Sequence, residues 1–301
     1  MDFRAGIEDG TAPPFSLREP SRQTIPVVCS SPHSGRAYPA EFIRRSQLGR
    51  EALRRSEDSF VDEIFALAPS LGAPLICALF PRVYVDANRE PYELDPLMFE
   101  DALPAYANTR SPRVAAGLGT IARVVAGGED IYARKLQVSE ALERIEACYR
   151  PYHAALGRLV DQTVERFGCS ILIDGHSMPS ATGPSAGGPA DTDGGRATAD
   201  VVLGDCFGSA CAPIVVETAE RMLKARGYRV ARNAPYAGGF TTRHYGRPQQ
   251  GLHALQVEIN RALYMDERAI ERTAYLPKLA SDMAHVVAEL GRLDSASLLE
   301  G

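Results

Sequence analysis

Apolar and polar residues alternate in blocks along this chain, and the blocks have two different lengths. Short runs rich in Val, Ile and Leu, bounded by Gly, Pro, Asp or Ser, predict β-strands. Two of these runs, VVCSS and ILIDG, are continuous enough to be strands that are buried on both faces of a sheet. The predicted strands span residues 25–30, 73–80, 83–86, 170–174, 200–203, 229–232 and 254–259.

Longer segments between these runs place apolar residues at helical spacing. One predicted helix ends near Pro69, and another begins at Ser139, stops at Gly168 and has a kink at Pro151. The predicted helices span residues 51–68, 139–167, 211–226 and 267–290. Strands that alternate with helices indicate an α/β fold with three αβα layers and a mixed, mostly parallel sheet. Ligands of such folds bind beyond the carboxyl ends of the strands.

Two segments do not follow this alternation. Residues 1–22 contain acids and prolines and predict an irregular N-terminal segment. Residues 178–199 are rich in Gly, Pro, Ser and Asp and predict a long loop directly after a strand, which is either functional or a surface insertion. The length of 301 residues is compatible with one large core, so we expect a single domain over residues 1–301.

Composition and charge exclude several classes of protein. The net charge of −5 leaves no basic excess to neutralise phosphates, which argues against a nucleic-acid partner. The N-terminal residues form no secretory signal and no apolar run is long enough to cross a bilayer, so we expect a soluble, cytoplasmic protein without a membrane partner. The six cysteines form no C-x-x-C pair, so a metal site would use histidine and carboxylate. The sequence is silent on oligomeric state.

The histidines divide by their predicted positions. His33 and His176 lie in small-residue turns directly after the two buried strands, where ligands of an α/β fold bind. Three others are interpreted as packing or surface residues: His153, His285 and His253. The role of His244, which lies in a predicted loop, stays open. Two histidines at neighbouring strand ends predict a metal site, since a catalytic zinc ion commonly has two His and one carboxylate as ligands.

The third ligand has two candidates. Asp58 and Asp62 lie one turn apart in the helix predicted after His33, and Asp58 is preferred because it lies nearer the start of that helix. The alternative is that both acids are ordinary residues of a helix surface. Zn²⁺ is the expected cofactor, although cobalt, iron and nickel share the preference for this set of ligands.

A hydrolytic metal site also needs a proton acceptor. Glu258 lies late in an apolar strand, where a charge is costly without a partner, and is the candidate general base. The alternative is a buried salt bridge with Arg261. Arg36 is a candidate donor to the oxyanion that forms during hydrolysis.

Two further segments are candidates for binding a small anionic substrate. Arg82, Asn88 and Arg89 follow a predicted strand, and Arg binds carboxylates through paired hydrogen bonds. A structural pair between Arg89 and Asp86 is the alternative. The second segment is a predicted loop in which two glycines precede a row of polar and aromatic donors, as in a loop that closes over a ligand. Its candidates for substrate binding are Thr242, Arg243 and Tyr245.

Seven blocks of the sequence together resemble the N-formylglutamate amidohydrolase family. They occur in the same order between about residues 25 and 270: SSPHSGRAYP, EDSFVDEIF, RVYVDANREPYELDP, LIDGHSMPS, VVLGDCFGSAC, NAPYAGGFTTRHYGRP and LQVEINRALYMDE. The resemblance implies a fold of the zinc-exopeptidase (phosphorylase/hydrolase-like) type, within the zinc carboxypeptidase-like superfamily. It also implies zinc-dependent hydrolysis of the linear amide of N-formyl-L-glutamate to formate and glutamate, at the end of one route of histidine degradation.

The resemblance assigns roles to residues by position. It implies that His33, Asp58 and His176 bind zinc, that Glu258 is the general base, and that Asn88 and Arg89 hold a substrate carboxylate. One departure from the carboxypeptidase pattern is that no H-x-x-E follows His33, because position 36 is Arg, which keeps the third ligand open. Two alternatives remain: a carboxypeptidase-like or other N-acyl amino acid amidohydrolase, and a protein that binds a small acid without turnover.

Overall fold

The computed structural model describes residues 13–180 and 199–299, so most of the loop predicted over 178–199 lies outside the described residues. The described chain forms two compact units. One comprises residues 13–16, 32–57 and 77–155, and the other comprises residues 17–31, 58–76, 156–180 and 199–299. The single domain expected from the sequence stays a prediction.

A sheet of seven strands organises the fold, with the order β1-β3-β2-β4-β7-β5-β6. Its strands are β1 (Phe15–Arg18), β2 (Val27–Ser31), β3 (Leu75–Ala78), β4 (Ser170–Met178), β5 (Val201–Gly204), β6 (Val230–Arg232) and β7 (Leu252–Asn260). β2 pairs with β4 and β4 with β7 in parallel, β5 pairs with β6 in parallel, and β5 pairs with β7 antiparallel. The mixed, mostly parallel sheet predicted from the sequence is therefore confirmed.

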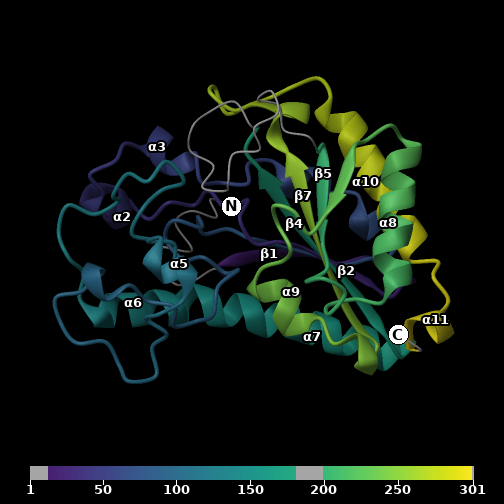
Figure 1. Cartoon of the computed structure of the whole chain (residues 1–301), viewed down its shortest axis with the longest axis horizontal. Coiled ribbons are helices and arrows are strands. Elements are labelled where there is room, and N and C mark those ends of the chain that lie inside the picture. The colour runs from purple at the N-terminus through teal and green to yellow at the C-terminus, as the bar shows by residue number, and fades with distance from the viewer. Residues whose placement is uncertain (1–12, 181–198, 300–301) are drawn as a thin grey trace. The chain divides into compact units, whose positions relative to one another are not determined.

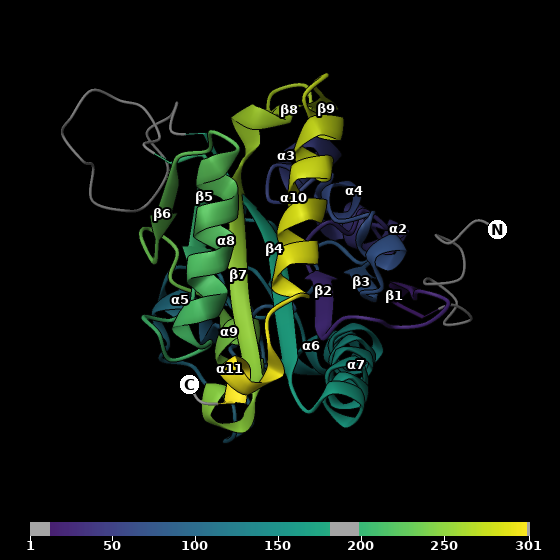
Figure 2. The same ribbon diagram turned by 90° about the vertical axis from the view of Figure 1, so that its right-hand side faces the viewer.

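Helices complete the fold, and several are short. The α-helices are α2 (Ala40–Arg45), α3 (Arg50–Arg54), α4 (Val61–Ile64), α5 (Pro112–Ala115), α6 (Val138–Arg144), α7 (Arg150–Phe167), α8 (Pro213–Ala225), α9 (Phe240–Tyr245), α10 (Leu276–Leu290) and α11 (Ser295–Leu299). α8 and α10 lie side by side on one face of the sheet (Figure 1), with α8 in front of β7 and α10 in front of β4 (Figure 2). α9 packs against β7 and β4. A small hairpin of β8 (Met265–Asp266) and β9 (Glu271–Arg272) precedes α10.

Burial explains why the central strands could be predicted. Every residue of β2, β4 and β5 is buried, as expected for strands that are covered on both faces. β4 is longer than predicted and continues through His176 to Met178. Its polar second half does not form an apolar run, so only the pairing with β7 reveals that it is a strand.

Three predictions of secondary structure are wrong. Residues 83–86 form no strand, because the carbonyl of Pro81 accepts hydrogen bonds from the backbone N–H groups of Tyr84 and Val85 and closes a turn. The helix predicted over 51–68 is interrupted before α4, where Phe60 has a left-handed φ of 68°. The helix predicted over 267–290 begins only at Leu276, after the β8–β9 hairpin.

The kink predicted at Pro151 has a counterpart just before it. Residues Ile145–Tyr149 form a π-helical turn between α6 and α7. Proline lacks the N–H of a regular helical bond, and its ring crowds the preceding turn. Prolines and π-turns are both recognised places where a helix bends.

Gly175 has a structural role in β4, between Asp174 and His176. A Cβ atom at this position would lie 2.4 Å from Cε2 of Phe65 and 3.2 Å from the carbonyl oxygen of Ser30. Gly175→Ala is therefore expected to lower the free energy of unfolding by about 1–3 kcal/mol, as overpacking does. Gly157→Ala in α7 is the control: its Cβ would meet nothing within 4 Å, and we expect a gain of about 0.5–1 kcal/mol. Guanidinium unfolding measures both, and equal stabilities for the two variants would contradict the close approach.

Candidate metal centre and active site

Parallel pairing between β4 and β7 places two of the candidate residues next to each other. His176 and Glu258 are direct partners in the register of these strands. The sequence predicts His176 in a turn after the strand, and this is wrong, because His176 lies within β4. Strand neighbours in register are about 4.8 Å apart, so the imidazole and the carboxylate start from adjacent backbone positions. Both side chains are buried.

His33 reaches the same region through β2. It lies two residues beyond Ser31, the last residue of that strand, and β2 pairs with β4 so that Ser30 is opposite Asp174. Nε2 of His33 lies 2.7 Å from Oδ1 of Asp86. Burial alone would raise the pKa of Asp86, but Arg89, His33 and Arg82 together hold it well below its usual value. Asp86 is therefore an ionised partner for the His33 ring.

Asp58 lies in the segment between α3 and α4, and not on a helix as predicted. Its Oδ2 lies 3.1 Å from Nδ1 of His176. The other oxygen, Oδ1, accepts hydrogen bonds from Oγ of Ser177 at 3.0 Å and from Nη2 of Arg261 at 3.2 Å. Arg261 also donates from Nε to Oγ of Ser177. These donors fix the orientation of the carboxylate and leave Oδ2 facing the histidine.

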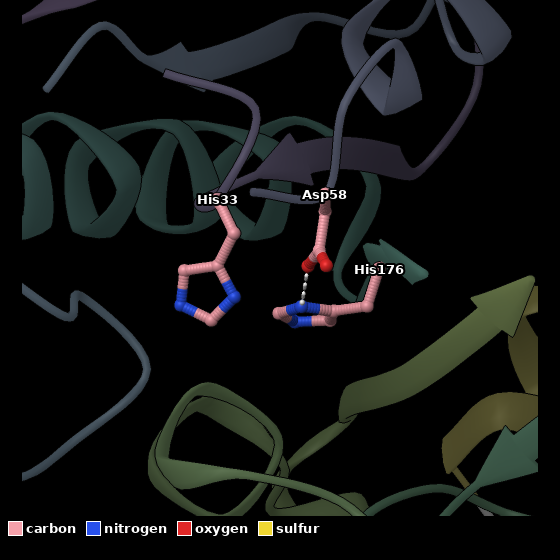
Figure 3. Close-up of side chains that lie close together, drawn as sticks. All are labelled: His33, Asp58 and His176. Carbon is pink, nitrogen blue, oxygen red and sulfur yellow. Dashed lines mark hydrogen bonds and ion pairs between the residues drawn. The ribbon is translucent and has the colours of Figure 1, made fainter. Parts of the chain in front are cut away.

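The three side chains form a group that can hold a metal ion. His33, Asp58 and His176 each offer one ligand atom, these atoms all lie within 4.8 Å of one another, and all three residues are buried. Figure 3 shows both imidazoles and the carboxylate directed toward the same small region. Two ligands about 2.1 Å from one tetrahedral ion are about 3.4 Å apart, close to the 3.1 Å between Asp58 and His176. Asp58, and not its alternative Asp62, belongs to this group.

The charges around His176 also suit a cation. Burial would lower the pKa of this imidazole, but Asp174, Asp58 and Glu258 raise it well above its usual value. Asp174 is completely buried, and its Oδ2 lies 2.9 Å from Nε2 of His176. Carboxylates thus surround the ring, so the site favours positive charge.

Glu258 has its own polar support. Nε2 of Gln256 donates to Oε1 of Glu258 at 2.9 Å, and Oγ1 of Thr242 donates to Oε1 of Gln256 at 3.4 Å. The sequence left open a salt bridge between Glu258 and Arg261. Arg261 donates to Asp58 and Ser177 as described above, and the salt bridge stays an alternative. The role of Glu258 as general base stays a prediction.

The Asn-Arg segment makes the structural contacts that were the alternative interpretation. Arg89 is buried and donates from Nε to the carbonyl of Leu118 and from Nη1 to the carbonyl of Asn88, both at 2.8 Å. Its Nη2 lies 3.5 Å from Oδ2 of Asp86. Arg82 donates to the same oxygen of Asp86 at 3.0 Å. A role for Asn88 and Arg89 in binding substrate stays a prediction.

The predicted loop with polar donors is partly a helix. Thr242 and Tyr245 are buried residues of α9, whereas Arg243 is exposed and donates from Nη1 to the carbonyl of Gly238 at 3.2 Å. Arg36 is half-buried in the segment after His33. No contact with a substrate tests these residues, so their roles also stay predictions.

The remaining histidines have structural surroundings. His253 is buried, its Nδ1 accepts from the backbone N–H of Ala212, and its Nε2 donates to the carbonyl of Leu298. His153 hydrogen-bonds the carbonyl of Ala87 from within α7. His244 is exposed in α9, where its ring stacks on that of Phe240. His285 is exposed in α10, where it contacts the carbonyl of Ser281.

Sequence reasoning missed the residues that orient the metal group. These are Asp86, Asp174, Ser177 and Arg261, each within hydrogen-bonding distance of His33, Asp58 or His176. One signal was available for Asp174. In the sequence D-G-H it lies two positions before His176, so both side chains project from the same face of a strand.

The fold and the site together define an α/β protein with a buried His-Asp-His group that can bind a metal. The chain belongs to the N-formylglutamate amidohydrolase family, whose model matches residues 25–265. It is 30% identical to the N-formylglutamate deformylase of Pseudomonas putida over 269 residues, which cover 88% of this chain and 91% of that protein. The corresponding enzyme of Pseudomonas aeruginosa is also 30% identical, over 89% of this chain and 92% of its own length.

One solved structure agrees with this assignment, and a second shares the fold. The crystal structure of an N-formylglutamate amidohydrolase from Ralstonia eutropha JMP134 matches with a TM-score of 0.86 and 38% identity, over 93% of this chain and 98% of that one. A gene product of Agrobacterium tumefaciens has a TM-score of 0.62 at 17% identity, over 97% and 98% of the two chains, and shares the fold. Within residues 13–180 and 199–299, no helix is long and apolar enough to span a membrane.

Proposed function

We propose that this protein is an N-formylglutamate deformylase that hydrolyses N-formyl-L-glutamate to formate and glutamate with the help of one divalent cation, Zn²⁺ in the first place. The observation that carries the proposal is the buried group of His33, Asp58 and His176 beside Glu258, in a chain that belongs to the N-formylglutamate amidohydrolase family. The two Pseudomonas relatives are named for this activity.

The ligand set fits a catalytic cation. Two imidazoles and one carboxylate are a common protein ligand set for catalytic zinc, and three protein ligands leave a position for water or substrate. His33, Asp58 and His176 would hold the ion, while Asp86 and Arg261 keep His33 and Asp58 in place. When bound, the cation would supply a Lewis acid that polarises the formyl carbonyl and makes water a better nucleophile at neutral pH.

Glu258 transfers the proton of the attacking water. Its carboxylate accepts a proton from the attacking water, whose oxygen forms a bond to the formyl carbon. Glu258 then donates this proton to the amide nitrogen as the carbon–nitrogen bond breaks, so that formate and the free amine of glutamate leave. Gln256 donates to Oε1 of Glu258 and so orients the carboxylate that handles this proton.

Cationic and polar side chains hold the anionic parts of the substrate. Arg36 donates to the oxygen of the formyl group as negative charge develops there. The two carboxylates of glutamate are bound by residues from two segments of the chain: Asn88 and Arg89 from the first, and Thr242, Arg243 and Tyr245 from the second. Arg89 and Thr242 exchange hydrogen bonds within the protein for bonds to the substrate. A guanidinium pairs with a carboxylate through two parallel hydrogen bonds, which favours a dicarboxylate over a neutral N-acyl amino acid.

Removal of the cation tests the proposal. The purified protein is expected to contain about one zinc ion per chain, the number that a site with three ligands holds. A chelator is expected to abolish formate release from N-formylglutamate, because it removes the Lewis acid that polarises the carbonyl, and added Zn²⁺ should restore it. Metal analysis and a formate assay, before and after chelation, give the result.

A substrate panel distinguishes the alternatives. N-formylglutamate should exceed N-acetylglutamate, N-formylleucine and a C-terminal dipeptide in kcat/KM. Faster cleavage of the dipeptide would support a carboxypeptidase-like enzyme. Zinc at full occupancy with ligand binding and no hydrolysis of any compound would indicate a binding protein and would contradict the proposed activity.

A further inference from the structure

The His176 ring has a carboxylate at each of its two nitrogens. Oδ2 of Asp58 lies 3.1 Å from Nδ1, and Oδ2 of Asp174 lies 2.9 Å from Nε2. Both aspartates are at most 1% exposed. A metal ligand can offer only one of these nitrogens to the cation, so the two carboxylates must have different roles.

The contact between Asp58 and Nδ1 indicates which nitrogen of His176 faces the cation. Asp58 belongs to the metal-binding group together with His33, whereas Asp174 is not a member of that group. The side of the ring that carries Nδ1 is therefore the side on which the ligand atoms gather. Nε2 points the other way, toward Asp174.

Asp174 is itself held rigidly. Its Oδ1 accepts a hydrogen bond of 2.6 Å from Oγ of Ser30, which is its direct partner in the pairing of β2 with β4. Asp174 and His176 are two residues apart on β4 and so project from the same face. The carboxylate is thus fixed by the buried centre of the sheet, with its second oxygen aimed at the ring.

We propose that Asp174 is the positioning residue of His176: it accepts the proton of Nε2 and so keeps the lone pair of Nδ1 directed at the cation. The inference rests on the proposed function, since it needs a cation at the His33–Asp58–His176 group. A carboxylate on the far nitrogen of a metal-binding histidine fixes the tautomer, orients the ring and makes the ligand nitrogen more basic. Asp174 does all three from a position that the cation does not touch.

A purely structural role is the competing explanation. Asp174 also ties β4 to β2 through Ser30, and this tie alone could account for a buried aspartate. Two substitutions separate the roles. Asp174→Asn keeps the shape and can still contact Ser30 but removes the charge, whereas Ser30→Ala removes the tie and leaves the carboxylate opposite His176.

Zinc affinity is the first measurement. Metal-free, full-length protein is titrated with Zn²⁺ in competition with a chromophoric chelator, and thermal unfolding of the metal-free forms is recorded in parallel. The dissociation constant of Asp174→Asn is expected to rise by about 10–100-fold, the usual effect of removing such a partner. Ser30→Ala should bind zinc nearly as tightly as the wild type. Equal affinities for Asp174→Asn and the wild type, or an equal loss in both variants, would overturn the proposal.

The second measurement identifies the protonated nitrogen of His176, and it uses the wild-type protein. In zinc-loaded protein labelled with ¹⁵N-histidine, NMR spectra should show the proton of His176 on Nε2. A proton on Nδ1 would refute the inference. Failure of the proposed function gives a different result. A wild-type protein that binds no zinc would contradict both proposals. If the wild type binds zinc and releases formate, and Asp174→Asn binds zinc equally tightly, only this inference is contradicted.

Discussion

Glu258→Gln is expected to lower kcat for N-formylglutamate by about 10²–10⁴-fold, the usual contribution of a general acid–base group, while the protein keeps its zinc. Glutamine has nearly the shape of glutamate but cannot accept the proton of the attacking water. Its side-chain oxygen can still accept the hydrogen bond that Gln256 gives to Oε1 of Glu258, so the local packing is preserved. The measurement is formate release at saturating substrate, with metal analysis of the same sample.

A matched control shows whether the loss is specific. Glu271→Gln removes an exposed carboxylate of β9 and should leave both kcat and zinc content unchanged. An active, zinc-loaded Glu258→Gln enzyme would remove Glu258 from the mechanism. The hydrogen bond from Gln256 to this buried carboxylate would then have a structural role.

The sheet could be predicted from the sequence because its central strands are buried from solvent. β2 and the first half of β4 are buried on both faces, so nearly every position favours an apolar residue and the strands appear as uninterrupted runs. The second half of β4 could not be recognised in this way. Close packing against Phe65 requires Gly175, and the site uses His176 and Ser177. Because these residues are small or polar, this half of the strand has no apolar run.

The three residues of the metal group were predicted, but the local structure around Asp58 and His176 was not. His33 could be placed because it directly follows an apolar strand, and strand ends are where α/β folds bind ligands. Asp58 was predicted on a helix, but it lies in an interrupted segment in which residues 56–59 are polar and buried. Partners such as Glu57, which accepts from Tyr38 at 2.8 Å, hold this segment out of helical form.

Two of the orienting residues, Asp86 and Arg261, could not be predicted because their contacts are distant in sequence. Asp86 lies 53 positions from His33, and Arg261 lies 203 positions from Asp58. Periodicity and local motifs carry no information on such pairs.

His33→Ala is expected to remove the cation and, with it, the hydrolytic activity. It deletes one of three protein ligands, so zinc affinity should fall by more than the roughly 10–100-fold that loss of an outer partner costs. The fold should survive the change. Asp86, which loses the His33 ring, keeps hydrogen bonds from Nη2 of Arg82 at 3.0 Å and from the backbone N–H of Asn88 at 2.9 Å, so its buried charge stays paired.

The control for His33→Ala is His285→Ala, which removes an exposed imidazole from α10 and should change neither zinc content nor formate release. Circular dichroism and thermal unfolding of the metal-free proteins establish that both variants are folded. If folded His33→Ala retains one zinc ion per chain and the rate of the wild type, the ion is held elsewhere. The convergence of His33, Asp58 and His176 would then be a buried polar cluster, and Glu258 would lose its place beside a reaction centre.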